Sequence, residues 1–231
     1  MPGAMQMMMG YGGGVVALPE LTFVGFTEDT SDSLTHTFTN HAIGAADATR
    51  RVVVCAHGSD AATAMTFSSI TIGGNAATIH VQGASSLNNV AIASLLVAAG
   101  TTATIVVTKV GGTPDRCAIG VYRAINETVA TPNATLVDET ISSGLFTGTI
   151  AIPANGWVVA CCQPSPGITV TGATWTGVTE QYDGAYGDAS AIFRTGGFAS
   201  GLAVDAARTV SCDWVASTDP TAGKMAAVSW G

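Results

Sequence analysis

The feature that most constrains the fold is an alternation of apolar and small polar side chains with a period of two residues. It recurs in short segments from about residue 21 onward, such as LTFVGFT (21–27) and SLTHTFT (33–39). A two-residue period places one set of side chains on each face of a β-strand. No stretch of twelve residues combines a 3.6-residue period with helix caps. About fifteen such segments at intervals of roughly 8–12 residues predict an all-β fold, an antiparallel β-sandwich or jelly-roll-like domain.

Turn residues and one continuous apolar run refine this prediction. RVVVCAH (51–57) is apolar without interruption, as expected of a strand buried on both faces. The Gly73-Gly74 pair within 67–82 and the turn at 153–156 favour hairpins. No charged or polar linker divides the chain, so we expect a single β-sandwich domain over residues 21–231.

Charged residues make up only 10% of the chain, against about 25% in an average soluble domain. With 31 threonines, the sheets are expected to carry Thr, Ser and Ala on their outer faces. The net charge of −8 and the presence of only two lysines disfavour binding to nucleic acid or to an anionic membrane surface. A surface so poor in charge favours burial against neighbouring subunits, and therefore a homo-oligomer.

Residues 1–20 differ from the rest of the chain, with five methionines in the first nine positions and no charge before Glu20. Methionine fills irregular apolar gaps, and glycine does not support an isolated helix. One interpretation is a frayed terminus. The other, which we favour, is an extended anchor peptide that orders in a partner subunit. The side chains expected to make this assembly contact are Met5, Met7, Met8, Met9 and Tyr11.

The five cysteines are predicted to be free thiols that act as small apolar residues. Adjacent Cys161 and Cys162 would point to opposite faces of a strand and are poorly placed to ligate one metal. No secretory signal or membrane-spanning run is evident, which favours folding in a reducing cytoplasm.

Catalytic, metal and cofactor sites are not predicted. The four histidines lack the spacing of a metal site, and no nucleophile-elbow motif occurs. His57 and Cys55 could point the same way from one strand end.

One aromatic and acidic segment could contact a host receptor or a glycan, and its candidate residues are Trp175, Glu180, Tyr182 and Tyr186. Strand alternation predicts Glu180 and Tyr182 on one face and Asp183 on the other.

Four successive motifs resemble a β-sandwich domain common in virion proteins of tailed phages and phage-like particles. They are RRVVVCAHG, SSITIGGNAAT, NVAIASLLVAAGTTATIVVT and CAIGVYRAINET, and the similarity continues in IPANGWVVA, TWTGVTEQYD and AAVSW. The Met/Gly-rich start also resembles the short N-terminal pegs of phage appendage proteins. The resemblance implies a structural virion protein and carries no catalytic signature.

We therefore expect a non-enzymatic subunit of a tail or head appendage, anchored by residues 1–20 and assembled in the cytoplasm of a bacterial host. Its expected partners are other virion proteins, further copies of itself, and a host surface receptor or glycan. Two alternatives remain open, a capsid decoration protein and a glycan-binding module of the bacterial surface.

Overall fold

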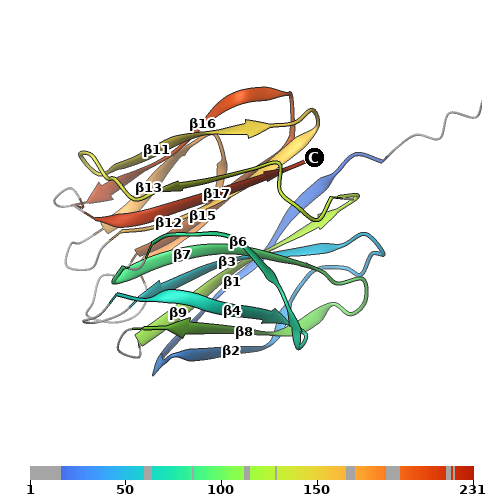
Figure 1. The fold of residues 1–231 in the computed structure, drawn as a ribbon, viewed down its shortest axis with the longest axis horizontal. Coiled ribbons are helices and arrows are strands. Elements are labelled where there is room, and N and C mark those ends of the chain that lie inside the picture. Colours follow the sequence, from blue (N-terminus) through green and yellow to red (C-terminus); the bar gives the residue numbers. More distant parts are fainter. Residues whose placement is uncertain are drawn as a thin grey trace, which may run out of the picture.

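The computed structural model describes residues 17–59, 64–84, 86–111, 115–127, 129–164, 170–185, 193–216, 220 and 222–231, and throughout these ranges the regular elements are β-strands (Figure 1). The strands of the N-terminal half are β1 (Glu20–Ser33), β2 (Thr35–Ala42), β3 (Arg51–Ser59), β4 (Thr66–Ile72), β5 (Asn75–Ala76), β6 (Thr78–Gln82), β7 (Asn88–Leu96), β8 (Thr102–Val110) and β9 (Asp115–Ile125). The strands of the C-terminal half are β10 (Ala134–Asp138), β11 (Leu145–Ile152), β12 (Gly156–Pro164), β13 (Val170–Thr176), β14 (Thr179–Ala185), β15 (Phe193–Leu202), β16 (Asp205–Ala216) and β17 (Gly223–Trp230). No helix of the described ranges could span a membrane.

The two halves share one strand order. The N-terminal half forms the sheets β1-β9-β3-β7-β6 and β2-β8-β4-β5, and the C-terminal half forms β10-β17-β12-β15-β14 and β11-β16-β13. Without the two-residue β5, each half has eight strands, which can be numbered one to eight in chain order. In the larger sheet of each half, strand one lies beside strand eight, followed by strands three, six and five. The other sheet of each half joins the second, seventh and fourth strands. Each half is therefore a sandwich of the same topology, the first sandwich and the second sandwich.

The two sandwiches stack face to face, so that four sheets form successive layers (Figure 1). Strand β3 shows why, because its alternate residues serve two cores. Val52 and Val54 point into the core of the first sandwich, whereas Val53 and Cys55 face the second sandwich. We call the layer of side chains between the two inner sheets the seam. Its fully buried residues include Val53, Cys55, Tyr122, Trp157, Val159, Cys161, Val228 and Trp230.

The seam is rich in aromatic rings. Trp157 and Trp230, paired across β12 and β17, stack with ring centroids 4.4 Å apart. Tyr182 packs against Phe26 at 4.6 Å and Phe23 at 5.6 Å. Burial of such large rings, each removing roughly 150–250 Å² from water, makes the seam a hydrophobic core in its own right.

The structure confirms the all-β, sandwich-like fold and changes its expected layout. The described residues of 21–231 form two stacked sandwiches rather than one, because both inner sheets are apolar on both faces. The described part of the connection between them, 126–127 and 129–133, carries only one charged side chain, Glu127. It therefore lacks the run of charged residues from which a linker can be predicted in a sequence.

Several local expectations are confirmed. Gly73 and Gly74 adopt positive φ angles of 60° and 81° at their turn, which glycine tolerates without a Cβ clash. Cys161 faces the seam and Cys162 faces the core of the second sandwich. All five cysteines are buried free thiols.

Two strands differ from the sequence pattern. Strand β10 lies in ATLVD, where the pattern predicts no strand. The pattern predicts two separate strands, AIFRT (191–195) and GLAVD (201–205), whereas β15 runs without a break from Phe193 to Leu202. Gly196 and Gly197 interrupt its apolar pattern, yet a Cβ on Gly196 would lie 2.4 Å from the Tyr182 hydroxyl. The glycine keeps the strand continuous by making room for this ring.

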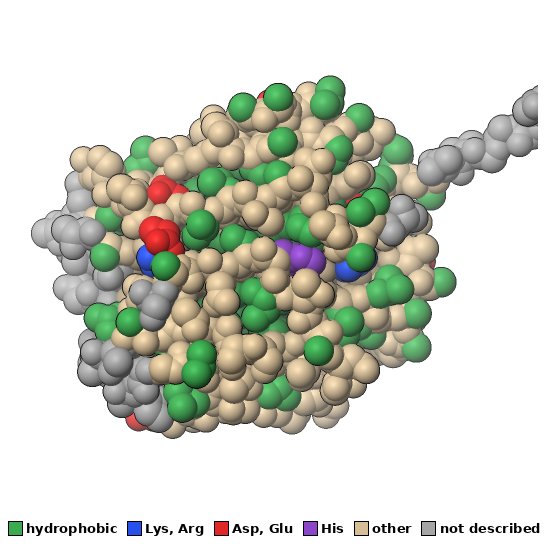
Figure 2. Space-filling view, in the orientation of Figure 1, with side chains coloured by type: hydrophobic (Ala, Val, Ile, Leu, Met, Phe, Trp, Pro, Cys, Tyr) green, Lys and Arg blue, Asp and Glu red, His purple; other side chains and the backbone are tan. Residues whose placement is uncertain are grey.

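The outer faces carry few charged side chains, as Figure 2 shows for one side of the molecule. Threonine alternates with buried residues along the outer strands. On β2, Thr35, Thr37 and Thr39 are exposed while Phe38 is buried. The expected threonine-rich outer surface is thus confirmed on this strand.

Candidate functional site

The described part of the predicted contact segment lies on β13 and β14 of the second sandwich, but Trp175 and Tyr182 turn inward. Trp175 is half-buried, and its indole Nε1 donates a hydrogen bond to Thr195 Oγ1 at 2.8 Å. The Thr195 hydroxyl in turn donates to the main-chain oxygen of Tyr182 at 3.1 Å. Trp175 therefore helps to tie β13 to the neighbouring sheet. Tyr186 lies outside the described residues.

Tyr182 is only 8% exposed and belongs to the seam. Its ring fits over Gly120 of β9 and Gly196 of β15, where an added Cβ would lie 2.5 Å from the nearest ring carbon in each case. Its hydroxyl lies 2.9 Å from Nε2 of His57. A side chain held between two sheets is not available to an external sugar, so the burial of Tyr182 argues against its predicted contact role.

A register shift in β14 explains why Glu180 and Tyr182 do not lie on the same face of the strand, although the sequence predicted that they would. Glu180 pairs with Gly197, but Tyr182 pairs with Gly196, so Gln181 forms a bulge. A bulge adds one residue and reverses the alternation beyond it. Glu180 and Asp183 therefore share the face opposite to Tyr182, contrary to the alternation predicted from sequence.

The bulge brings two carboxyl groups together. Burial, followed by the negative charge and hydrogen bond of Asp183, raises the pKa of Glu180 to about 7. Burial disfavours the charged carboxylate, and repulsion from Asp183 adds to this effect, so Glu180 keeps its proton to a higher pH. This pair can take up or release a proton near neutral pH.

A polar network crosses the seam around His57. Gln163 Nε2 donates to the Gly58 oxygen at 3.1 Å and to Asn88 Oδ1 at 2.9 Å. Complete burial, reinforced by the positive charge of Arg194, holds the pKa of His57 well below its usual value, so the ring is neutral. The expectation that Cys55 and His57 point the same way is confirmed, because both face the second sandwich.

An ion pair adds a second tie between the sandwiches. Arg194 Nη1 of β15 lies 2.9 Å from Glu28 Oε1 of β1, and both groups are largely buried. Removing one partner of a buried pair leaves an uncompensated charge. This network thus fixes the register of one sandwich on the other.

The anchor residues Met5, Met7, Met8, Met9 and Tyr11 lie outside the described residues. Within the described ranges, no three His, Cys, Asp or Glu side chains gather as a metal site. Each histidine makes a separate hydrogen bond, His36 to Asp29, His41 to Ala42, His57 to Tyr182 and His80 to Ser94.

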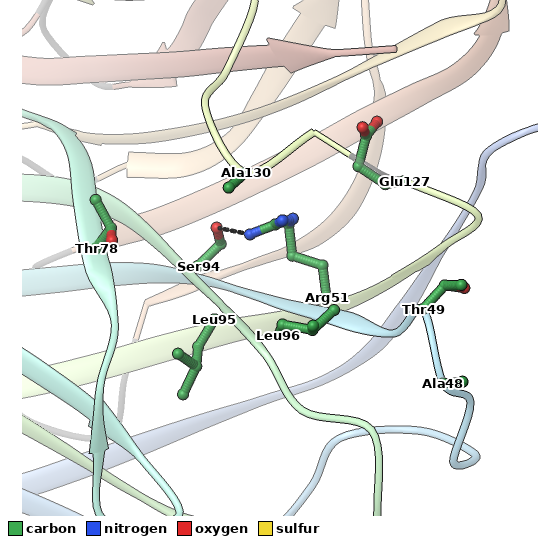
Figure 3. Close-up of a pocket in the computed structure, with 9 residues that line it drawn as sticks. All are labelled: Ala48, Thr49, Arg51, Thr78, Ser94, Leu95, Leu96, Glu127 and Ala130. Atoms are coloured by element: carbon green, nitrogen blue, oxygen red, sulfur yellow. Dashed lines mark hydrogen bonds between the residues drawn. The ribbon is translucent and has the colours of Figure 1, made fainter.

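A cavity that sequence reasoning missed opens beside the first residue of β3. Its volume is about 510 Å³, and its lining comes from the β2–β3 loop, from the inter-sandwich connection and from β3, β6 and β7 (Figure 3). Arg51 lies at its centre, between Ser94 on one side and Glu127 on the other. One feature of the sequence could have pointed to this cavity: a charged residue, Arg51, stands at the start of the otherwise apolar segment RVVVCAH (51–57).

Arg51 makes far fewer hydrogen bonds than its neighbour Arg50 among the described residues. The Arg50 guanidinium donates to four main-chain oxygens at 2.7–2.8 Å, those of Gly44, Val97, Ala99 and Gly100. Arg51 is only 6% exposed, yet among the described residues it makes one hydrogen bond, from Nη1 to Ser94 Oγ at 3.3 Å. Its Nε is buried without a partner.

No family model matches the chain, and neither a curated protein nor a solved structure shows significant similarity.

Proposed function

We propose that the chain is a non-enzymatic structural subunit of a tailed-phage-like particle. It forms a tail or head appendage, is anchored by its N-terminal segment and packs against further copies of itself. Each half would be a sandwich of the jelly-roll type. The shared strand order, with the first strand beside the last and the second beside the seventh, supports this assignment.

The observation that carries the proposal is the composition of the outer edge strands. β2, β11 and β13 are edge strands of the two outer sheets, and none contains Asp, Glu, Lys or Arg. Monomeric proteins commonly protect such edges with charged side chains, especially lysine. Uncharged edges suit pairing with strands of neighbouring subunits.

The buried charged groups support a structural role. Arg50 holds four main-chain oxygens of the loops beside β3, and Arg194 pairs with Glu28 across the seam. These groups stabilise the stacking of the sandwiches and the loops at their ends.

Immunogold labelling of intact particles tests the proposal. Culture supernatant from the native host would be labelled with antibody to this protein and viewed by negative-stain electron microscopy. Gold on tails or head–tail junctions is expected, whereas gold spread over heads would indicate a capsid decoration protein. Gold on cells, with unlabelled particles, would overturn the virion role in favour of a bacterial surface module.

A further inference from the structure

The cavity beside Arg51 contains a buried charge whose hydrogen-bonding capacity is largely unused. A guanidinium has five N–H donors and never acts as an acceptor. In Arg51 one donor group reaches Ser94 at 3.3 Å, and the buried Nε has no partner among the described residues. Buried donors without partners are costly, and proteins retain few of them.

The one carboxylate among the described lining residues is hydrogen-bonded to groups other than Arg51. Glu127 lines the opposite side, but its oxygens accept hydrogen bonds from the main-chain N–H of Val129 at 2.9 Å and from Trp157 Nε1 at 3.2 Å. No ion pair forms between Arg51 and Glu127 in the described part of the chain, although the Glu127 charge favours the protonated guanidinium. Burial is the larger influence and lowers the pKa of Arg51. Among the described residues, Ser94 Oγ is therefore the one hydrogen-bond acceptor that the Arg51 guanidinium has.

The positive charge of Arg51 also affects the protonation of a nearby histidine, His80. Its Nε2 lies 2.8 Å from Ser94 Oγ, the same hydroxyl that Arg51 contacts. Burial and the positive charge of Arg51 lower the pKa of His80 to about 4. His80 is thus neutral at pH 7 and leaves Arg51 as the cation of the cavity.

We propose that this cavity binds a small sugar acid, with the ligand carboxylate on Arg51. A carboxylate supplies the paired acceptor oxygens that match the guanidinium fork. Thr78 offers a hydroxyl to the sugar, and Leu96, which pairs with Arg51 across β3 and β7, offers an apolar surface to its C–H face. The volume of about 510 Å³ lies within the range of about 300–1,000 Å³ typical of small-ligand pockets. This role goes beyond assembly and does not depend on it.

The test uses the full-length protein and a matched pair of probes, D-glucuronate and D-glucose, which differ only in the carboxylate. Binding is followed by NMR chemical shifts of the backbone and of the His80 imidazole. We expect glucuronate to bind at least about tenfold more tightly than glucose, as a charge-assisted hydrogen bond implies. Bound carboxylate should also raise the pKa of His80, because it offsets the repulsion from Arg51.

Two variants make the test specific. Arg51→Gln should abolish the preference for glucuronate. The Arg51 side chain is buried, so its loss could affect folding. A second variant, Thr78→Val, changes an exposed residue of the lining and should weaken the binding of glucuronate several-fold. Thr209→Val on a distant outer face is the matched control and should leave binding unchanged.

Three outcomes would overturn the proposal. They are equal binding of glucuronate and glucose, no binding of either at millimolar concentration, or tighter binding of an apolar carboxylate such as N-acetyl-leucine. Since the isolated protein is used, a failure here leaves the virion role untouched, and a failed immunogold experiment leaves this site untouched.

Discussion

His57 Nε2 lies 2.9 Å from the hydroxyl oxygen of Tyr182, and this hydrogen bond joins two residues 125 positions apart in the chain. One residue belongs to the first sandwich and the other to the second. The bond is buried among aromatic rings, where a missing partner cannot be replaced readily by water. The pair therefore reports directly on the integrity of the seam.

Tyr182→Phe keeps the ring that fills the space beside Gly120 and Gly196 but removes the hydroxyl. We expect a loss of about 1–3 kcal/mol in the free energy of unfolding, because the His57 imidazole then loses a buried partner. Urea denaturation followed by tryptophan fluorescence measures this change. In a His57→Leu background the same substitution should cost clearly less; equal costs in the two backgrounds would show that the bond contributes nothing.

Glu180 makes the stability of the second sandwich depend on pH. Its pKa is raised from about 4.5 to about 7 by burial and by Asp183, so the folded state holds a proton that the unfolded state releases. Its contribution to stability is therefore present at low pH and is lost as pH rises from about 4.5 to about 7.

The measurement compares the unfolding free energies of the native protein and Glu180→Gln across this pH range. The difference, native minus variant, should decrease steadily as pH rises. His80 acts in the opposite sense: burial lowers its pKa to about 4, so its contribution increases with pH up to about 6.5. The difference between the two proteins cancels the His80 contribution, and a difference that does not vary with pH would contradict the prediction.

Thr149 and Thr209 offer a matched pair for testing the edge strands. They are cross-strand neighbours, and both are exposed, but Thr149 lies on edge strand β11 and Thr209 on central strand β16. Thr149→Lys should reduce self-association, because a charged edge disfavours pairing with another strand. Thr209→Lys should have a much smaller effect. Sedimentation velocity at several concentrations distinguishes the two, and an equal response would argue against edge pairing.

Deletion of residues 1–16 tests the anchor. Strand β1 begins only at Glu20, and Leu21 is the first residue of the seam core, so the truncated protein should keep its melting temperature. Its incorporation into particles should be lost, as seen by immunoblotting of purified particles after complementation. Normal incorporation of the truncated protein would exclude the anchor role.

Much of the fold could be predicted from sequence because strand periodicity is local. The alternation in SLTHTFT and the glycine pair at 73–74 specify a strand and a turn without reference to distant residues. The same local logic placed Cys161 and Cys162 on opposite faces. It failed at Gln181, because the bulge depends on pairing with β15 and carries no signal of its own in the sequence.

The sequence by itself determined the β class, the turns, the threonine-rich surface and the apolar use of the cysteines, since each follows from composition or from a two-residue period. Only the tertiary structure decided that two sandwiches of equal topology stack through a seam, because a strand buried on both faces looks the same whichever sheets cover it. It also decided that Tyr182 is enclosed while Arg51 lines a cavity. Burial of a side chain depends on segments that are far apart in the chain, and the period of a single strand does not encode them.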